Sequence, residues 1–324
     1  MKNNNMNAVV HKTYGDPSVL FLTTVEKPTP GKGEILVAIK NTSVTAGDVL
    51  IRKGSPIVVR FISGLFKPRN PILGHEYAGI VESTGAGVQT FQAGDRVFGS
   101  TGTKSGTYAE YMVVKEDDII AKLPENISYE SAGTIPVGAL TALYFLQKGG
   151  ISKEKNVLIH GASGSVGTAA VQIAKAYGAA VTAVCSGDKK PFVQALGADR
   201  VIDYKTEDFS KSAERFDLVF NVAGQTSFKE CQAVMKPKAM YVASSAHSSD
   251  YGKMFFGKKA DRSRIVANLM KESKENLEEI ARMIAAGKLK GVVDKLFALN
   301  ELAAAHRYVE KGKKIGNVSI IVNA

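Results

Sequence analysis

The stretch VLIHGASGSVGTAAVQIAKAYGA, residues 157–179, decides the fold of this chain. It predicts a short buried strand, a glycine-rich turn and an amphipathic helix in immediate succession. Ala162, Gly164 and Gly167 occupy the three positions of the G-x-G-x-x-G turn, with alanine at the first. Glycine at the second position lets a pyrophosphate approach the backbone, glycine at the third lets helix and strand pack closely, and the helix start offers unpaired N–H groups. The stretch therefore predicts a dinucleotide site.

The sequence on either side of this stretch predicts two kinds of architecture. Before Pro124, short β-type runs separated by glycine and proline are typical of a compact, mainly antiparallel β domain. After Pro124, brief apolar strands alternate with longer helical segments, which is the pattern of βαβ units and a doubly wound parallel sheet. The fold class is therefore α/β. The early runs cover residues 8–14, 33–44, 76–85, 95–100 and 108–114; later strands are expected at 156–161, 180–185, 200–203, 216–224, 239–245 and 317–322, and helices at 166–178, 190–197, 227–236, 275–286 and 301–312.

Bulk composition indicates a globular protein in a reducing compartment. With 324 residues and 44% hydrophobic content, the chain is long enough for two cores. We expect no membrane span, because no stretch approaches the roughly 18 to 20 apolar residues that one requires. Residues 1–7 are too polar for a signal peptide, so a cytoplasmic location is expected. The two cysteines, Cys185 and Cys231, are too few for a disulfide framework or a four-cysteine zinc site.

The formal net charge of +11 indicates a surface that attracts phosphates. Most of this charge is scattered, and the densest basic segment is residues 60–69. Two interpretations of that segment stay open: a solvated or packed loop, and the mouth of a site for an anionic or lipophilic ligand. In it, basic residues interleave with apolar ones: Arg60, Lys67 and Arg69 with Phe61, Ile62, Leu65 and Phe66.

The end of the next strand predicts which dinucleotide is preferred. Sites for NAD place an acid there, about 20 residues on, to hold the ribose hydroxyls. In this chain that place falls on Ser186 in VCSGDKK, followed by Lys189 and Lys190. A hydroxyl and two ammonium groups suit a 2′-phosphate and favour NADPH. Asp188 is the alternative, because NADH would be accepted if its carboxylate pointed into the site.

Four stretches in their order and spacing resemble the medium-chain dehydrogenase/reductase family. The resemblance implies a GroES-like catalytic domain over residues 1–125 and 271–324, interrupted by a Rossmann NADP-binding domain over residues 126–270. It also implies a homodimer. The stretches are GHEYAGIVESTGAGVQTFQAGDRVFG (74–99), GALTALYFL (138–146), the glycine turn with LGADRVIDY (196–204), and HRYVEKGKKIGNVSIIV (306–322).

The chain departs from the zinc-dependent members of that family at the metal positions. Two of their three ligand positions fall on or near Thr45 and Val137, which leaves His75 alone, and the loop at 99–111 has no cysteine for a structural zinc. We therefore expect no metal, and expect His75 to be a hydrogen-bonded structural residue. The chain is similar to the zinc-free quinone oxidoreductase branch. Alcohol oxidation in this family uses the metal as a Lewis acid on the oxygen. Without a metal, the expected acceptors are compounds that are easier to reduce, namely quinones or α,β-unsaturated carbonyl compounds (enals and enones).

The resemblance also implies roles for individual residues. Thr45 and Asp48 would be catalytic, in the loop that meets the nicotinamide, and Thr141 would contact the nicotinamide or its ribose. Tyr204 would contact the adenosine half. The pyrophosphate would be bound by Ser163, Gly164, Ser165, Val166 and Gly167, the 2′-phosphate by Ser186, Lys189 and Lys190, and the cofactor cleft would be lined by Asn221, Ala223, Ser244, Ser245 and Ala246.

Two other functions were weighed against the reductase. The basic balance would allow a non-catalytic or moonlighting protein that binds NADPH or RNA, although no aromatic stacking platform or basic stripe is present, so no nucleic-acid partner is expected. A short-chain dehydrogenase would need a Tyr-x-x-x-Lys pair after the glycine turn, whereas Tyr144 and Lys148 precede it. The expected acceptor loops are 54–71 and 249–264. Their phenylalanines hint at a hydrophobic acceptor or serve packing: Phe61, Phe66, Phe255 and Phe256.

Overall fold

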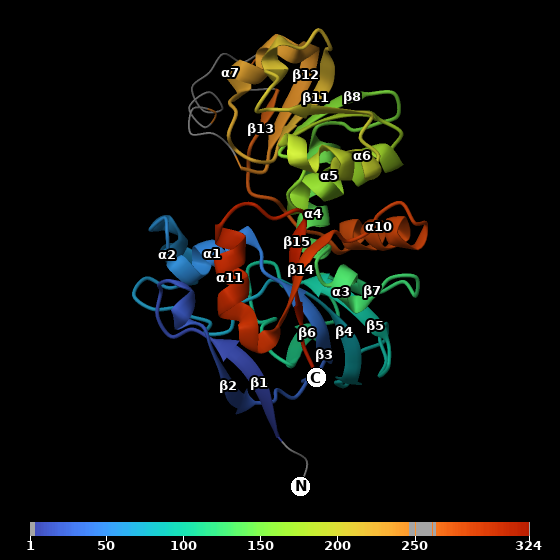
Figure 1. The fold of residues 1–324 in the computed structure, drawn as a ribbon. Helices are drawn as coiled ribbons and strands as arrows, with labels where there is room; N and C mark the ends of the chain where they lie inside the picture. Colours follow the sequence, from blue (N-terminus) through green and yellow to red (C-terminus); the bar gives the residue numbers. More distant parts are fainter. Residues whose placement is uncertain (1–3, 246–249, 251–260, 262–263, 324) are drawn as a thin grey trace. The chain divides into compact units, whose positions relative to one another are not determined.

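The computed structural model describes residues 4–245, 250, 261 and 264–323, which form two compact units (Figure 1). The first unit comprises Met1–Val137, Ser273–Ala285 and Lys290–Ala324. The second comprises Gly138–Glu272 and Ala286–Leu289. The chain thus leaves the first unit after Val137, returns to it at Ser273, and leaves it again only for Ala286–Leu289.

The first unit is built on a mainly antiparallel sheet. Among the described residues this sheet has seven strands in the order β14-β15-β3-β4-β5-β7, with β6 paired to β3. β3 is central, and its alternate residues Ile35, Val37 and Ile39 are fully buried. The strands are β3 (Glu34–Ser43), β4 (Glu76–Thr84), β5 (Arg96–Ser100), β6 (Tyr111–Lys115), β7 (Ile120–Lys122), β14 (Val293–Ala298) and β15 (Asn317–Ile321), beside a separate pair, β1 (Asn5–Val10) and β2 (Phe21–Glu26).

Short helices cover this sheet. Helix α10 packs against β7 through Leu277, Ile280 and Ile284, which recur at helical spacing, and this confirms the helix expected at 275–286. Helix α3 packs against β3, β4 and β15, and the first compact unit runs to Val137. The helices are α1 (Ala46–Lys53), α2 (Val58–Ser63), α3 (Tyr129–Ala132), α10 (Lys274–Ala285) and α11 (Leu302–Glu310).

The second unit is a parallel sheet whose described strands number six, in the order β10-β9-β8-β11-β12-β13. The chain moves outward from β8 through β9 to β10 and then returns to β11 on the other side of β8. This reversal makes β8 and β11 the switch point of a doubly wound sheet, where ligands bind at the carboxyl ends of the strands. The predicted combination of antiparallel and parallel sheets is therefore confirmed. The strands are β8 (Asn156–His160), β9 (Ala180–Cys185), β10 (Arg200–Asp203), β11 (Phe216–Asn221), β12 (Met235–Ala243) and β13 (Ile265–Val266), and the helices are α4 (Pro136–Lys148), α5 (Ser165–Ala176), α6 (Lys190–Ala195) and α7 (Phe228–Cys231).

Two expected elements differ from the structure. The first strand begins at Asn5 and not at Ala8, because Asn5 pairs with Glu26 and the side chain of Met6 is buried. The helix expected at 227–236 shrinks to α7, because β12 already begins at Met235 and Pro237 disfavours helical backbone at the residue before it. In the described part of the chain, no helix combines the length and apolarity needed to cross a membrane.

Candidate functional site

The glycine turn between β8 and α5 has the geometry of a phosphate cradle. Gly164 caps α5 in extended conformation, and a Cβ placed on it would meet no atom closer than the carbonyl oxygen of Gly161, at 3.8 Å. A Cβ on Gly167 would lie 2.2 Å from that same oxygen, so no side chain fits there. The first N–H groups of the helix have no partner within it. The turn is thus open above Gly164 and tightly packed below Gly167, as a pyrophosphate site requires.

Gly161 is a residue of this turn that the sequence analysis missed. Its φ is +88°, a conformation that favours glycine. A Cβ on it would lie 2.9 Å from the Cβ of Ala223 and 3.1 Å from the backbone nitrogen of that residue. Gly161 therefore supplies the sharp turn and lets the ends of β8 and β11 approach each other. The signal was its place as the first glycine of the run 161–167.

The far end of the predicted cofactor site is the carboxyl edge of β9 and β10. Ser186 follows β9 and is buried, and its hydroxyl bonds the exposed carboxylate of Asp188, which lowers the pKa of that carboxyl. Lys205 approaches the same carboxylate, with Nζ 4.0 Å from Oδ1. Tyr204, which precedes Lys205 in the sequence, is half exposed. Lys205 was also missed, although it directly follows Tyr204, because its position depends on the pairing of β10 with β9.

The two predicted lysines lie at the start of the next helical segment. Lys189 ends a 3₁₀ turn, its backbone N–H donates to the carbonyl of Ser186, and Lys190 begins α6. The structure therefore gathers Ser186, Asp188 and three lysines at one edge of the sheet. A second carboxylate, that of Asp203, lies at the same edge, where a Cβ on Gly187 would be 2.3 Å from its Oδ2.

The predicted cleft residues divide into two groups. Ala223 adjoins the glycine turn, and Ser245, in the loop after β12, lies against Gly224 in the loop after β11. Asn221, in contrast, uses its amide inside the unit: Nδ2 donates to the carbonyl of Thr226 and to the Tyr241 hydroxyl, and Oδ1 accepts from the N–H of Gly224. Asn221 therefore fixes the loop after β11.

The other residues predicted for the cofactor cleft and the acceptor loops lie in different parts of the second unit or outside the described residues. Ser244 donates its backbone N–H to the carbonyl of Asn221. Thr141 is nearly buried on α4, whose Gly138 packs against Ser165 at the start of α5. Ala246, Phe255 and Phe256 lie outside the described residues.

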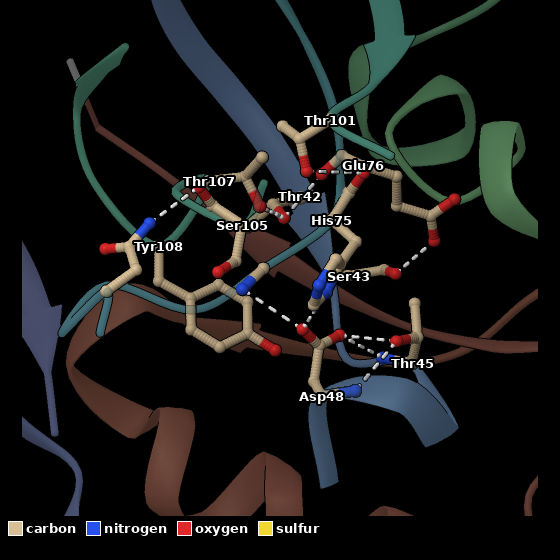
Figure 2. A network of polar contacts seen from close by, with 12 residues as sticks. Thr42, Ser43, Thr45, Asp48, His75, Glu76, Thr101, Ser105, Thr107 and Tyr108 are labelled. Carbon is tan, nitrogen blue, oxygen red and sulfur yellow. Dashed lines mark hydrogen bonds and ion pairs between the residues drawn. The ribbon is translucent and has the colours of Figure 1, made fainter. Parts of the chain in front are cut away.

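In the first unit, the predicted catalytic pair forms the centre of a buried polar network (Figure 2). Thr45 caps α1, and Asp48 completes a capping box with it. Asp48 Oδ2 accepts from the backbone N and the hydroxyl of Thr45, at 2.8 and 2.6 Å. Oδ1 accepts from the N–H of Gly74 at 3.0 Å and pairs with His75 Nδ1 at 2.6 Å. The hydrogen bond expected of His75 is therefore present.

Asp48 remains ionised in spite of complete burial. Burial alone would raise its pKa, but the charge and hydrogen bond of His75, together with the bond from Thr45, outweigh it and hold the pKa below the ordinary value. A carboxylate that accepts this many bonds is a poor proton donor. Its hydrogen bonds suit a residue that orients Thr45 and His75, and the catalytic role expected of it stays a prediction.

The network continues inward to α11. The hydroxyl of Tyr108 lies 3.2 Å from His306 Nε2, and Tyr108 also bonds Asp48. Burial lowers the pKa of His306 to about 4, so its ring is neutral at pH 7. Arg52 is fully buried on α1 and pairs with Glu310 of α11. This network ties α11 to α1 although about 250 residues separate them in sequence.

The residues present do not fit a zinc ion. His75 Nδ1 is held by Asp48, and the carboxylate of Glu76 accepts from the Ser43 hydroxyl and from the backbone N–H of Val137. Thr45 and Val137 offer no ligand of the kind that zinc prefers. Among the residues that the structure describes, no three His, Cys, Asp or Glu side chains are grouped to hold a metal.

Comparison with protein families gives two matches. Residues 31–125 match the alcohol dehydrogenase GroES-like domain, and residues 196–320 match a domain described as zinc-binding dehydrogenase. The second range includes none of the positions discussed for zinc, namely 45, 75 and 137.

Individual relatives cover almost the whole chain. The chloroplast envelope quinone oxidoreductase homolog of Arabidopsis thaliana is 30% identical, over 97% of this chain and 98% of the relative. The 2-methylene-furan-3-one reductase of Solanum lycopersicum is 28% identical, over 97% of this chain and 79% of the relative. Among solved structures, the quinone oxidoreductase from Coxiella burnetii superimposes with a TM-score of 0.87 at 27% identity, covering 98% of this chain and all of that one.

Proposed function

Because the chain belongs to the medium-chain dehydrogenase/reductase family, on its quinone oxidoreductase branch, we propose that it is an NADPH-dependent, zinc-free reductase of quinones or enals and enones. The observation that carries the proposal is the glycine turn, open above Gly164 at the switch point of a doubly wound sheet. Relatives named for a quinone and for an enone support the two acceptor classes.

The residues of the second unit would hold NADPH from end to end. The N–H groups at the start of α5 would bind the pyrophosphate, and Lys189, Lys190 and Lys205 would pair with the 2′-phosphate near the Ser186 hydroxyl. The exposed carboxylate of Asp188 opposes this, but Lys205 lies close enough to offset part of its charge. Bound there, the cofactor supplies a hydride.

The acceptor chemistry follows from the side chains of the first unit. Zinc-dependent relatives polarise an alcohol oxygen with the metal, whereas Thr45 and His75 offer only hydrogen bonds. Hydride addition to a carbon conjugated with a carbonyl places negative charge on oxygen, and oriented donors stabilise that charge. Asp48 would orient both side chains for this task. By family resemblance alone, we extend the proposal to a homodimer. We also propose a cytoplasmic location, because two cysteines without a disulfide framework suit a reducing compartment.

The proposal is tested by measuring NADPH oxidation with 9,10-phenanthrenequinone and with a panel of quinones, 2-alkenals and enones. Turnover should occur with members of at least one class, without added zinc. Salt-sensitive binding of RNA combined with no turnover of any acceptor would contradict the proposal and favour a binding protein.

A further inference from the structure

Exposed apolar side chains concentrate on one short segment of the first unit. The structure describes twelve large hydrophobic side chains as exposed, and six of them lie between residues 57 and 66. Phe66 is 89% exposed, and Phe61 and Ile62 are each 65% exposed. We call the six the apolar patch: Ile57, Val58, Phe61, Ile62, Leu65 and Phe66.

The apolar patch covers helix α2 and the residues just before and after it, and polar contacts hold the other side of the helix. Val58, Phe61 and Ile62 lie on α2, where spacings of three and four residues place side chains on one face, whereas Leu65 and Phe66 follow the end of the helix at Gly64. On the other side, Ser63 Oγ lies 2.8 Å from the Tyr14 hydroxyl, and Arg60 stacks 4.8 Å from the Tyr14 ring and donates Nε to the carbonyl of Gly54. A surface helix usually buries its apolar face. Here the polar contacts hold α2 with that face outward.

The segment around the patch carries charge of one sign. No Asp or Glu occurs between residues 49 and 75, whereas five basic residues do. Two of these, Arg52 and Lys53, pair with Glu310, which leaves Arg60, Lys67 and Arg69 beside the patch. Lys67 and Arg69 are exposed and form no ion pair with any residue that the structure describes. Phenylalanines interleaved with arginine and lysine suit the interface of a membrane that carries negative lipids, because the rings enter the boundary region and the cations pair with phosphates.

We propose that residues 57–69 dock this protein on the surface of an anionic lipid bilayer, with Phe61 and Phe66 entering the interface and Lys67 and Arg69 lying against the headgroups. A second copy of the chain is a poorer occupant. A symmetric contact through this patch would bring Lys67 and Arg69 of each copy close to the same cations of the other. Docking of this kind goes beyond the proposed reductase activity and does not depend on it.

Co-sedimentation of the whole protein with vesicles tests the inference. The wild type should bind vesicles of phosphatidylcholine with phosphatidylglycerol, bind pure phosphatidylcholine weakly, and dissociate at high salt. Phe61→Ser with Phe66→Ser should weaken binding by about tenfold or more, because the interfacial apolar area is lost. Lys67→Gln with Arg69→Gln should weaken it by roughly thirtyfold on the anionic vesicles, at about 1 kcal/mol for each charge.

Matched controls carry the same chemical changes elsewhere. Leu269→Ser removes an apolar side chain that is also 89% exposed, and Lys153→Gln with Lys229→Gln removes two exposed charges of the second unit. Both should bind vesicles like the wild type. Because all these sites are exposed, thermal unfolding of every variant should match that of the wild type.

Several results would overturn the inference. One is a wild type that sediments equally with and without anionic vesicles, and another is patch variants that bind as the wild type does. A third is loss of self-association in the patch variants with vesicle binding unchanged, which would assign the patch to a second copy. The last is a raised KM of the patch variants for a water-soluble quinone without any vesicle binding, which would show that the patch lines the entrance of the acceptor site.

Discussion

At the scale of single residues, substitutions at Gly164 and Gly161 should have different effects: the first on cofactor binding, the second on stability. Gly164 has an ordinary φ of −83° and open space where a Cβ would lie, so Gly164→Ala should fold normally but obstruct the pyrophosphate. We expect NADPH to bind at least about tenfold more weakly to it, with the melting temperature unchanged. Fluorescence titration and thermal unfolding give both values, and unchanged NADPH affinity would contradict the placement of the pyrophosphate.

Gly161→Ala should behave in the opposite way. Its positive φ and its contact with Ala223 leave no room for a methyl group. We expect the free energy of unfolding to fall by about 1 to 3 kcal/mol. A variant as stable as the wild type in urea denaturation would show that the turn adopts another conformation.

Asp48→Asn tests the positioning role of this carboxylate. The amide keeps the size of the side chain but brings a donor toward His75 and Thr45, so we expect about 3 kcal/mol of lost stability. In the folded variant, kcat should fall and its pH profile should shift, because His75 loses its charged partner. The Kd for NADPH should stay constant, because the glycine turn belongs to the other unit. A variant with the kcat and pH profile of the wild type would show that Asp48 does not position His75 and Thr45 for turnover.

The residues expected to bind the adenosine half of the cofactor should determine whether NADPH or NADH is preferred. Ser186→Asp combined with Lys189→Ala should shift the preference from NADPH toward NADH, since a carboxylate replaces the hydroxyl and an ammonium is lost. Lys205→Ala alone should weaken NADPH binding and leave NADH binding unaltered. Ratios of kcat/KM for the two cofactors measure the effect, and unchanged ratios would mean that the 2′-phosphate lies elsewhere.

At the scale of elements, the attachment of α11 to α1 should depend on pH. The pKa of His306 is about 4 in the folded protein against 6.5 in the unfolded chain. The unfolded state therefore binds the proton more tightly, so stability is complete above pH 6.5 and falls as the pH drops toward 4, by about 3 kcal/mol in total. Unfolding of the wild type and of His306→Gln at pH 7 and 4.5 checks this, and the variant should lose less stability between the two. Equal losses would contradict it.

An element could be predicted from the sequence when the residues that determine it lie close together in the chain. The β8-turn-α5 unit follows from periodicity and glycine spacing within 23 residues. The extension of β1 to Asn5 and the early start of β12 depend on partner strands elsewhere in the sequence. For the same reason the internal bonds of Asn221, the contribution of Lys205 and the link from Tyr108 to His306 could not be predicted, because each joins segments that only the fold brings together.

At the scale of the whole molecule, the two units divide the proposed reaction between them. The second unit carries the glycine turn, and the first carries the hydrogen-bonding network and, among its described residues, no three His, Cys, Asp or Glu side chains grouped to hold a metal. This division predicts that cofactor binding and acceptor turnover respond to separate sets of substitutions, as the variants at Gly164 and Asp48 would show.

The most direct test is hydride transfer by metal-depleted protein. The enzyme, freed of metal with a chelator and checked by elemental analysis, is supplied with NADPH that carries deuterium at both C4 positions and with an enal or enone that the untreated enzyme reduces, and the product is examined by mass spectrometry. We predict deuterium on the product carbon conjugated with the carbonyl, at the rate seen before metal removal. Unlabelled product, or turnover that returns only when zinc is added, would contradict a zinc-free NADPH reductase.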